Sequence, residues 1–345
     1  MVQKSMCKPI STFNKKTLPS NLFLNILYEN NEDSSDNKDI RAFTNKIESY
    51  YSSSTHPENI PIVNEKFIKI CGQNIVIHDI TDKIKYCRDM NYYFDLVTGI
   101  VKSSNKIPND LKDKVIANVE QKWKEIPNGK YPDKCTREAN VNSIRKRCVL
   151  KHLHDLNGDK DLIQIYTNQY KTYLVDIWSK IIDYTSPRLG GLYIKIENDY
   201  VGIIEEYTNF LYSLDYICDV DLSKLSTDDI TISTDMDNLM NNISLERISP
   251  NNKKECYNKA YIDMLKKKTA NVKKINNVLS SGIALLGFSL ILILIYKFSP
   301  LGNLLRRYTK KKIEVDENMN EEEMSELYNN SENEKSYISY YSVSH

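Results

Sequence analysis

The stretch that decides the fold of this chain is Ile283-Ala-Leu-Leu-Gly-Phe-Ser-Leu-Ile-Leu-Ile-Leu-Ile295. It is the densest part of a run of 22 residues without a charge, Ile275 to Tyr296. As an α-helix this run would span roughly 33 Å, about the thickness of a bilayer core. A core helix of a soluble protein usually keeps a polar face, and residues 290–295 have none. The sequence therefore predicts one transmembrane helix at residues 275–297.

Basic residues flank this span equally, so they do not orient it. Within sixteen residues on each side lie six lysines or arginines: Lys259, Lys266, Lys267, Lys268, Lys273 and Lys274 before it, and Lys297, Arg306, Arg307, Lys310, Lys311 and Lys312 after it. Because both sides carry six basic residues, the positive-inside rule does not predict which side faces the cytoplasm.

Cysteine gives a second clue to orientation. All seven cysteines precede the span, and residues 298–345 contain none. This asymmetry is expected if the head, meaning residues 1–274, faces an oxidising compartment and the tail a reducing one. Seven is an odd number, and we take Cys7 as the unpaired residue. The disulfide candidates are the other six, whose pairing the sequence leaves open: Cys71, Cys87, Cys135, Cys148, Cys218 and Cys256. Free buried thiols are the alternative.

The rest of the chain divides by composition. Hydrophobic residues make up 41%, enough for a core, and the scarcity of Gly and Pro favours helices. We predict an all-α head, with no signal peptide before it and a helix over Glu197–Cys218 that repeats the three-four periodicity. The predicted segments are a loose leader (1–17), a helical ectodomain (18–218), a polar segment of low order (219–255), a membrane-proximal helix (256–274), the transmembrane helix (275–297) and a cytoplasmic tail (298–345). The tail is basic over 298–312 and acidic and disordered over 313–345.

No residue pattern indicates catalysis. The chain lacks the common nucleotide, zinc-protease and nucleophile-elbow motifs. The acidic run Asp155–Asp161 has its glycine at the wrong position for a calcium loop, and we interpret it as a turn at Gly158. The spacing of Cys148 and His152 suits zinc, but no further ligand pair completes such a site. We expect no enzyme activity, no cofactor or metal, no small-molecule substrate and, at a net charge of +1, no nucleic-acid partner.

Two segments resemble a known family. Cys87-Arg-Asp-Met-Asn91-Tyr92-Tyr-Phe-Asp95 is similar to the Cys-x-x-Leu-Asn-Tyr-Trp-Leu-Tyr segment of the Plasmodium interspersed repeat (Pir/Vir) proteins. Tyr296-Lys297-Phe298-Ser-Pro300-Leu-Gly302-Asn-Leu-Leu-Arg306 resembles the Tyr-Lys-Phe-Thr-Pro-Phe-Gly-x-Trp-Leu-Arg segment after their membrane span. The order of parts also matches over most of residues 18–306. The chain departs from the pattern at Tyr93 and Leu304, where the family usually has Trp, and its cysteines are sparse in mid-head.

The resemblance implies a variable antigen that a malaria parasite exports to the infected red cell. Membrane lipid would be one partner and a host cell-surface protein another, with a role in adhesion or immune evasion. The ectodomain would then lie outside or in a lumen and the tail in the cytoplasm. The alternative is an intracellular membrane tether or trafficking scaffold whose helical head lies in a reducing compartment.

Overall fold

The computed structural model describes residues 12–28, 40–53, 57, 83–125, 136–187, 190–245, 256–298, 300 and 302–313. The chain divides into two compact units, Met1–Thr269 and Ala270–His345. Several predicted features lie outside the described residues. They are most of the leader, nearly all of the acidic tail and three cysteines: Cys7, Cys71 and Cys135.

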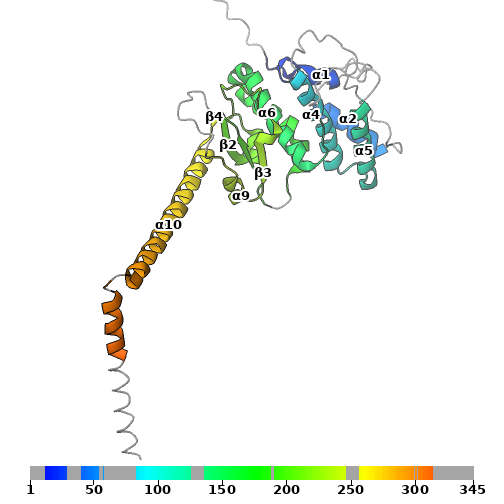
Figure 1. Cartoon of the computed structure of the whole chain (residues 1–345). Helices are drawn as coiled ribbons and strands as arrows, with labels where there is room; N and C mark the ends of the chain where they lie inside the picture. Colours follow the sequence, from blue (N-terminus) through cyan, green and yellow to red (C-terminus); the bar gives the residue numbers. More distant parts are fainter. Residues whose placement is uncertain are drawn as a thin grey trace, which may run out of the picture. The chain divides into compact units, whose positions relative to one another are not determined.

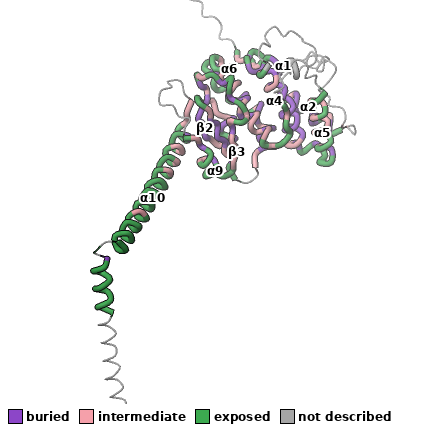
Figure 2. The backbone as a smooth tube through the Cα atoms, viewed as in Figure 1, coloured by how far each residue is buried: buried purple, intermediate pink, exposed green. Residues whose placement is uncertain are grey.

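The centre of the first unit is helix α4 (Lys83–Ser103), which is buried on almost every side from Asp89 to Val101 (Figures 1 and 2). Gly99 permits its close approach to a neighbouring helix, because a Cβ there would lie 3.0 Å from the carbonyl oxygen of Lys180. Helices in contact with α4 are α1 (Leu22–Tyr28), α2 (Ile40–Ser53), α5 (Asn109–Glu125), α6 (Val141–Ile165) and α7 (Thr167–Thr185). The prediction of a mainly helical head is therefore confirmed.

The prediction that the head is all-α is wrong, because it also contains a four-stranded sheet in the order β3-β1-β2-β4. Strands β1 (Tyr193–Glu197) and β2 (Val201–Glu206) form an antiparallel hairpin, and β2 lies where a helix was expected. The side chain of Asn198 closes the turn by accepting hydrogen bonds from the amides of Tyr200 (2.9 Å) and Val201 (2.8 Å). Only α8 (Tyr207–Tyr212) lies in the predicted helical stretch.

The polar segment also differs from the prediction. Over residues 219–245 the structure has a 3-10 turn (Thr227–Asp229), strand β3 (Ile230–Ser233) and helix α9 (Met236–Asn241). Composition misled the prediction because the segment buries five well-spaced apolar residues: Leu222, Leu225, Ile230, Leu239 and Ile243. The remaining strand, β4 (Cys256–Tyr257), pairs in parallel with β2.

Two smaller predictions are also corrected. Helix α6 continues past Gly158, because Leu156, Asp159 and Ile163 are buried on both sides of it and packing outweighs the cost of a glycine of about 1 kcal/mol. The part of the leader that the structure describes, residues 12–17, is ordered: Lys15 begins a 3-10 turn (Lys15–Thr17) and pairs with Asp176 at 2.6 Å.

Helix α10 (Lys259–Phe298) is the only helix among the described residues that is long and apolar enough to cross a membrane. Its apolar window has a mean hydropathy of 2.6 and none of it is buried by protein (Figure 2). The predicted membrane-proximal helix is continuous with the predicted transmembrane helix, but it begins at Lys259 and not at residue 256, because Cys256 and Tyr257 lie in β4. A second helical stretch occupies residues 302–313.

Candidate functional site

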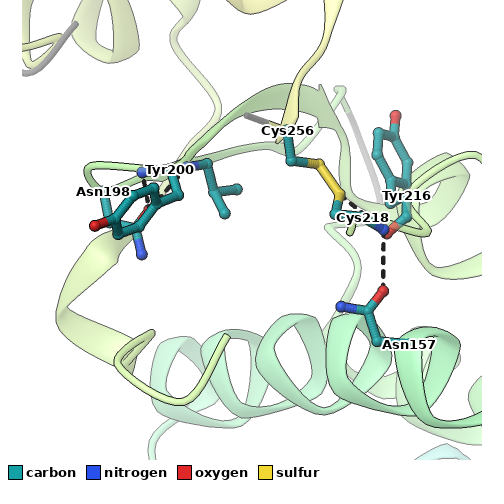
Figure 3. The surroundings of a disulfide bond; sticks show 7 residues. Asn157, Asn198, Tyr200, Tyr216, Cys218 and Cys256 are labelled. Carbon is teal, nitrogen blue, oxygen red and sulfur yellow. Dashed lines mark hydrogen bonds between the residues drawn. A yellow bond between two sulfur atoms is a disulfide. The ribbon is translucent and has the colours of Figure 1, made fainter. Parts of the chain in front are cut away.

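The site that distinguishes this molecule is the root of α10, which we define as residues 256–268. Cys256 in β4 forms a disulfide with Cys218, and the two Cα atoms are 5.6 Å apart (Figure 3). The backbone adds a hydrogen bond from the Cys256 amide to the Tyr200 carbonyl (2.8 Å). The Cys218 amide donates to the side chain of Asn157 in α6 at 3.0 Å, as Figure 3 shows. The disulfide therefore joins the root to both the sheet and the helices.

Asn258 begins α10 and fastens it to the sheet. Its side-chain oxygen accepts from the Tyr261 amide at 3.0 Å, as a helix cap does, and its side-chain nitrogen donates to the Ile204 carbonyl at 2.8 Å. One amide side chain thus satisfies a free N–H of the helix and a carbonyl of β2.

Two tyrosine rings pack the root against the hairpin. The rings of Tyr257 and Tyr261 stack with centroids 5.6 Å apart, and the Tyr261 hydroxyl donates to Glu197 at 2.9 Å. They cover Gly202, where a Cβ would collide with the Tyr257 ring and lie 2.6 Å from the Tyr261 ring. Lys268, two turns further on, donates to the carbonyls of Asn241 and Ile243. The first ten residues of α10 are therefore an integral part of the head.

A shallow hollow of about 570 Å³ opens beside the root. Its polar lining is mainly acidic, with Glu205, Asp215 and Asp263 against Lys259. Glu205 is engaged, because it accepts a hydrogen bond from the Tyr216 hydroxyl at 2.7 Å, and burial together with this contact raises the pKa of Tyr216. Within the described part of the chain, no group of His, Cys, Asp or Glu side chains is arranged to hold a metal ion.

The cysteine candidates have different fates. Cys218 and Cys256 are bonded to each other. Cys87 is also disulfide-bonded. Cys148 is a free thiol, so its choice as a disulfide candidate is wrong. It is 1% exposed, and burial raises its pKa well above the ordinary value, so the thiol stays protonated and unreactive. Cys71 and Cys135 are not among the described residues.

The first family-like segment lies in the buried helix α4. Tyr92 is 2% exposed and its hydroxyl donates to the Ile177 carbonyl in α7 at 3.0 Å. Asn91 donates to the Thr136 carbonyl (3.4 Å) and to the Cys87 sulfur (3.6 Å). Tyr92 therefore holds the head together from inside, whereas Cys87 and Asn91 also line a hollow of about 480 Å³.

Two buried ion clusters, which the sequence analysis missed, flank this segment. In the first, the Lys151 ammonium lies 2.8 Å from Asp89 and 2.9 Å from Asp155, and over the Tyr92 ring at 5.0 Å. Burial raises the pKa of Asp155 to about 7, and burial lowers the pKa of its neighbour on the helix, His152, to about 4. A signal was present, because Lys151 and Asp155 are four apart and next to the apolar stripe of α6.

The second cluster centres on Asp95, whose side chain has no exposed surface. Arg137 contacts it at 2.6 Å and Arg147 at 2.8 Å, and Arg137 also pairs with Glu120 at 2.9 Å. These pairs join α4, α5 and α6. Removal of one partner from a buried ion pair strongly destabilises a fold, because the other charge is left buried and unpaired. Both clusters therefore favour the one packing of the helices in which every charge has its partner.

The second family-like segment follows the apolar window of α10. Helix α10 ends at Phe298, and Pro300 and residues 302–313 are also helical. The Arg306 guanidinium lies over the Tyr296 ring, 5.2 Å from the ring centroid. The Lys297 ammonium lies 5.5 Å from the centroid of the Phe298 ring. The second unit thus brings together the first and last residues of the motif.

No protein-family model, no curated protein and no solved structure matches this chain.

Proposed function

We propose that this chain is a single-span membrane protein that displays its helical head as a variant surface antigen of a malaria parasite, exported to the infected red cell. The observation that carries the proposal is the Cys218–Cys256 disulfide at the root of the one membrane-length helix of the described residues.

The disulfide supports an outward head. Disulfides persist in secreted and surface-exposed proteins and are rare where glutathione keeps thiols reduced. This one lies on the head side of the apolar window of α10, and Cys87 forms a second. Since the basic residues flanking the span do not favour either orientation, the sulfur chemistry is the stronger guide.

The distribution of the family-like residues supports the antigen role. Tyr92 and Asp95 are buried, so the segment similar to Pir/Vir proteins serves the interior. Substitutions on an exposed surface away from such features usually change stability by only about 0.5 kcal/mol. A head with its sequence constraints inside can therefore vary its exterior, as immune evasion or adaptation to a host cell-surface protein requires.

Protease treatment of intact infected red cells tests the proposal. Trypsin added outside should remove the head, detected with an antibody to residues 136–187, and leave a protected fragment that carries residues 302–345. Cells permeabilised before trypsin provide the control, since both parts should then be lost.

Protection of the head in intact cells, together with alkylatable thiols at Cys218 and Cys256, would refute the surface role. That result would favour an intracellular tether with its head in a reducing compartment.

A further inference from the structure

We infer that residues 296–298, 300 and 302–313 form a membrane-surface elbow, which lays the helix at residues 302–313 onto an anionic lipid leaflet. This inference rests on the proposed membrane span. It adds a second lipid contact, with headgroups, to that of the apolar window.

The helix at residues 302–313 has two faces. At about 100° per residue, Leu304, Leu305 and Tyr308 fall within an arc of about 100°. All three side chains are more than half exposed in the structure. They form an apolar face that no protein group covers among the described residues of the chain.

The opposite face is cationic. Arg306, Arg307, Lys310 and Lys311 lie outside the apolar arc, whereas Lys312, about 80° from Leu304, falls within it. All are exposed, and none has a carboxylate partner within the described residues. Long basic side chains can lie along an apolar surface while their charged ends reach headgroups. An apolar face backed by clustered positive charge is typical of helices that lie in the interface of an anionic membrane.

The elbow gives this helix its place beside the span. Pro300 is helical and lacks the N–H that a helix interior requires, so it suits the first turn of the second helical stretch. Gly302 lies against the backbone of Tyr296, and a Cβ there would collide with the Tyr296 carbonyl. Arg306 then stacks on the Tyr296 ring at 5.2 Å. Tyrosine prefers the boundary between apolar chains and headgroups, so this contact brings the basic helix to the level of the headgroups.

Lipid is a better occupant than a protein groove. Helix α10 ends four residues before residue 302, so the membrane surface is already adjacent if the helix spans. The positive charges of the helix at residues 302–313 require a negatively charged partner. Anionic headgroups provide this charge without a specific binding groove.

Hydrogen exchange of the full chain in nanodiscs tests the inference. Discs of phosphatidylcholine alone are compared with discs containing phosphatidylserine. We expect the amides of residues 304–313 to exchange at least about tenfold more slowly on the anionic discs. This difference between discs should shrink in about 1 M salt, where the Debye length is about 3 Å. Equal exchange on both discs would overturn the inference.

Three variants make the test specific. Arg307→Gln, Lys310→Gln and Lys311→Gln together should abolish the difference between discs. The matched control removes three charges before the span, with Lys266→Gln, Lys267→Gln and Lys273→Gln, and should keep it. Gly302→Val should abolish it with every charge in place; retention of the difference would refute the elbow.

Incorporation into discs separates the two proposals. A chain that enters phosphatidylcholine discs but gains no protection on anionic discs contradicts the elbow alone. A chain that enters neither disc contradicts the span.

Discussion

Removal of the Cys218–Cys256 disulfide is the perturbation whose effect follows most directly from the structure. The two cysteines are 38 residues apart, and closing a loop of that length in the unfolded chain corresponds to about 4 kcal/mol of stabilisation. For a unit of this size each kcal/mol changes Tm by about 2–4 °C, so the Cys218→Ala, Cys256→Ala variant should melt about 8–16 °C lower. The hydrogen bonds of Asn258 remain, so the head should still fold.

The assay is thermal unfolding of the full chain in detergent. Trp123 and Trp178, the two tryptophans of the chain, both pack in the head core and report its unfolding by fluorescence. Cys148→Ala is the control for loss of a thiol, and it should cost only about 1 kcal/mol, because no cross-link is lost. A double variant that melts within about 2 °C of the parent would refute the reasoning, since it would mean that the cross-link does not constrain the unfolded chain.

Three further predictions concern the interior of the head. Lys151→Met leaves the two carboxylates that it bridges unpaired and should lower the free energy of unfolding in urea by about 3–5 kcal/mol; a loss below about 1 kcal/mol would contradict a paired cluster. His152 has a pKa of about 4 in the fold and 6.5 as its ordinary value, so it stabilises the fold above pH 6.5 and this contribution is lost as pH falls toward 4. Asp155 has a pKa of about 7 in the fold and 3.8 as its ordinary value. It therefore stabilises the fold below pH 3.8, and this contribution is lost as pH rises through 7. The two slopes oppose each other, so urea titrations of His152→Gln should show stability falling from pH 4 to 7, and those of Asp155→Asn should show it rising from pH 4 to 6.5; identical profiles for both variants would refute the assignment. Gly202→Val should cost about 1–3 kcal/mol in the same titration by displacing the tyrosine rings of the root, whereas Gly158→Ala, which meets open space, should gain up to about 1 kcal/mol; equal effects would contradict the packing at the root.

Regular helices were predictable because their apolar residues recur at three and four. Leu111, Val115 and Val119 recur at a spacing of four, as the apolar face of a helix does, and they are the buried residues of α5. The membrane-length helix was predictable for a simpler reason. A run of uncharged, strongly apolar residues requires no knowledge of the neighbours that pack against it.

The hairpin was not predicted because short buried strands and buried helices share a composition. Ile203, Ile204 and Tyr207 fit a helical period, yet the first two lie in β2 and are buried by long-range packing. Asn198-Asp199 between two isoleucine-rich runs was the available turn signal.

The root of α10 could be predicted only in part. Cysteine count indicated disulfides, but Cys218 meets Cys256 because the parallel pairing of β4 with β2 brings them together, and that pairing depends on the whole sheet. The stacking of Tyr257 and Tyr261 over Gly202 likewise joins residues more than fifty positions apart. The spacing of residues along the sequence does not predict such long-range contacts.

Extraction of membranes with alkaline carbonate tests the central claim most directly, that α10 crosses a lipid bilayer. The full chain should remain in the membrane pellet, and a variant with Leu290→Arg and Ile293→Arg should be released, because each arginine at the centre of a span costs about 2.5–3.5 kcal/mol. Recovery of the intact parent chain in the carbonate supernatant would contradict the account.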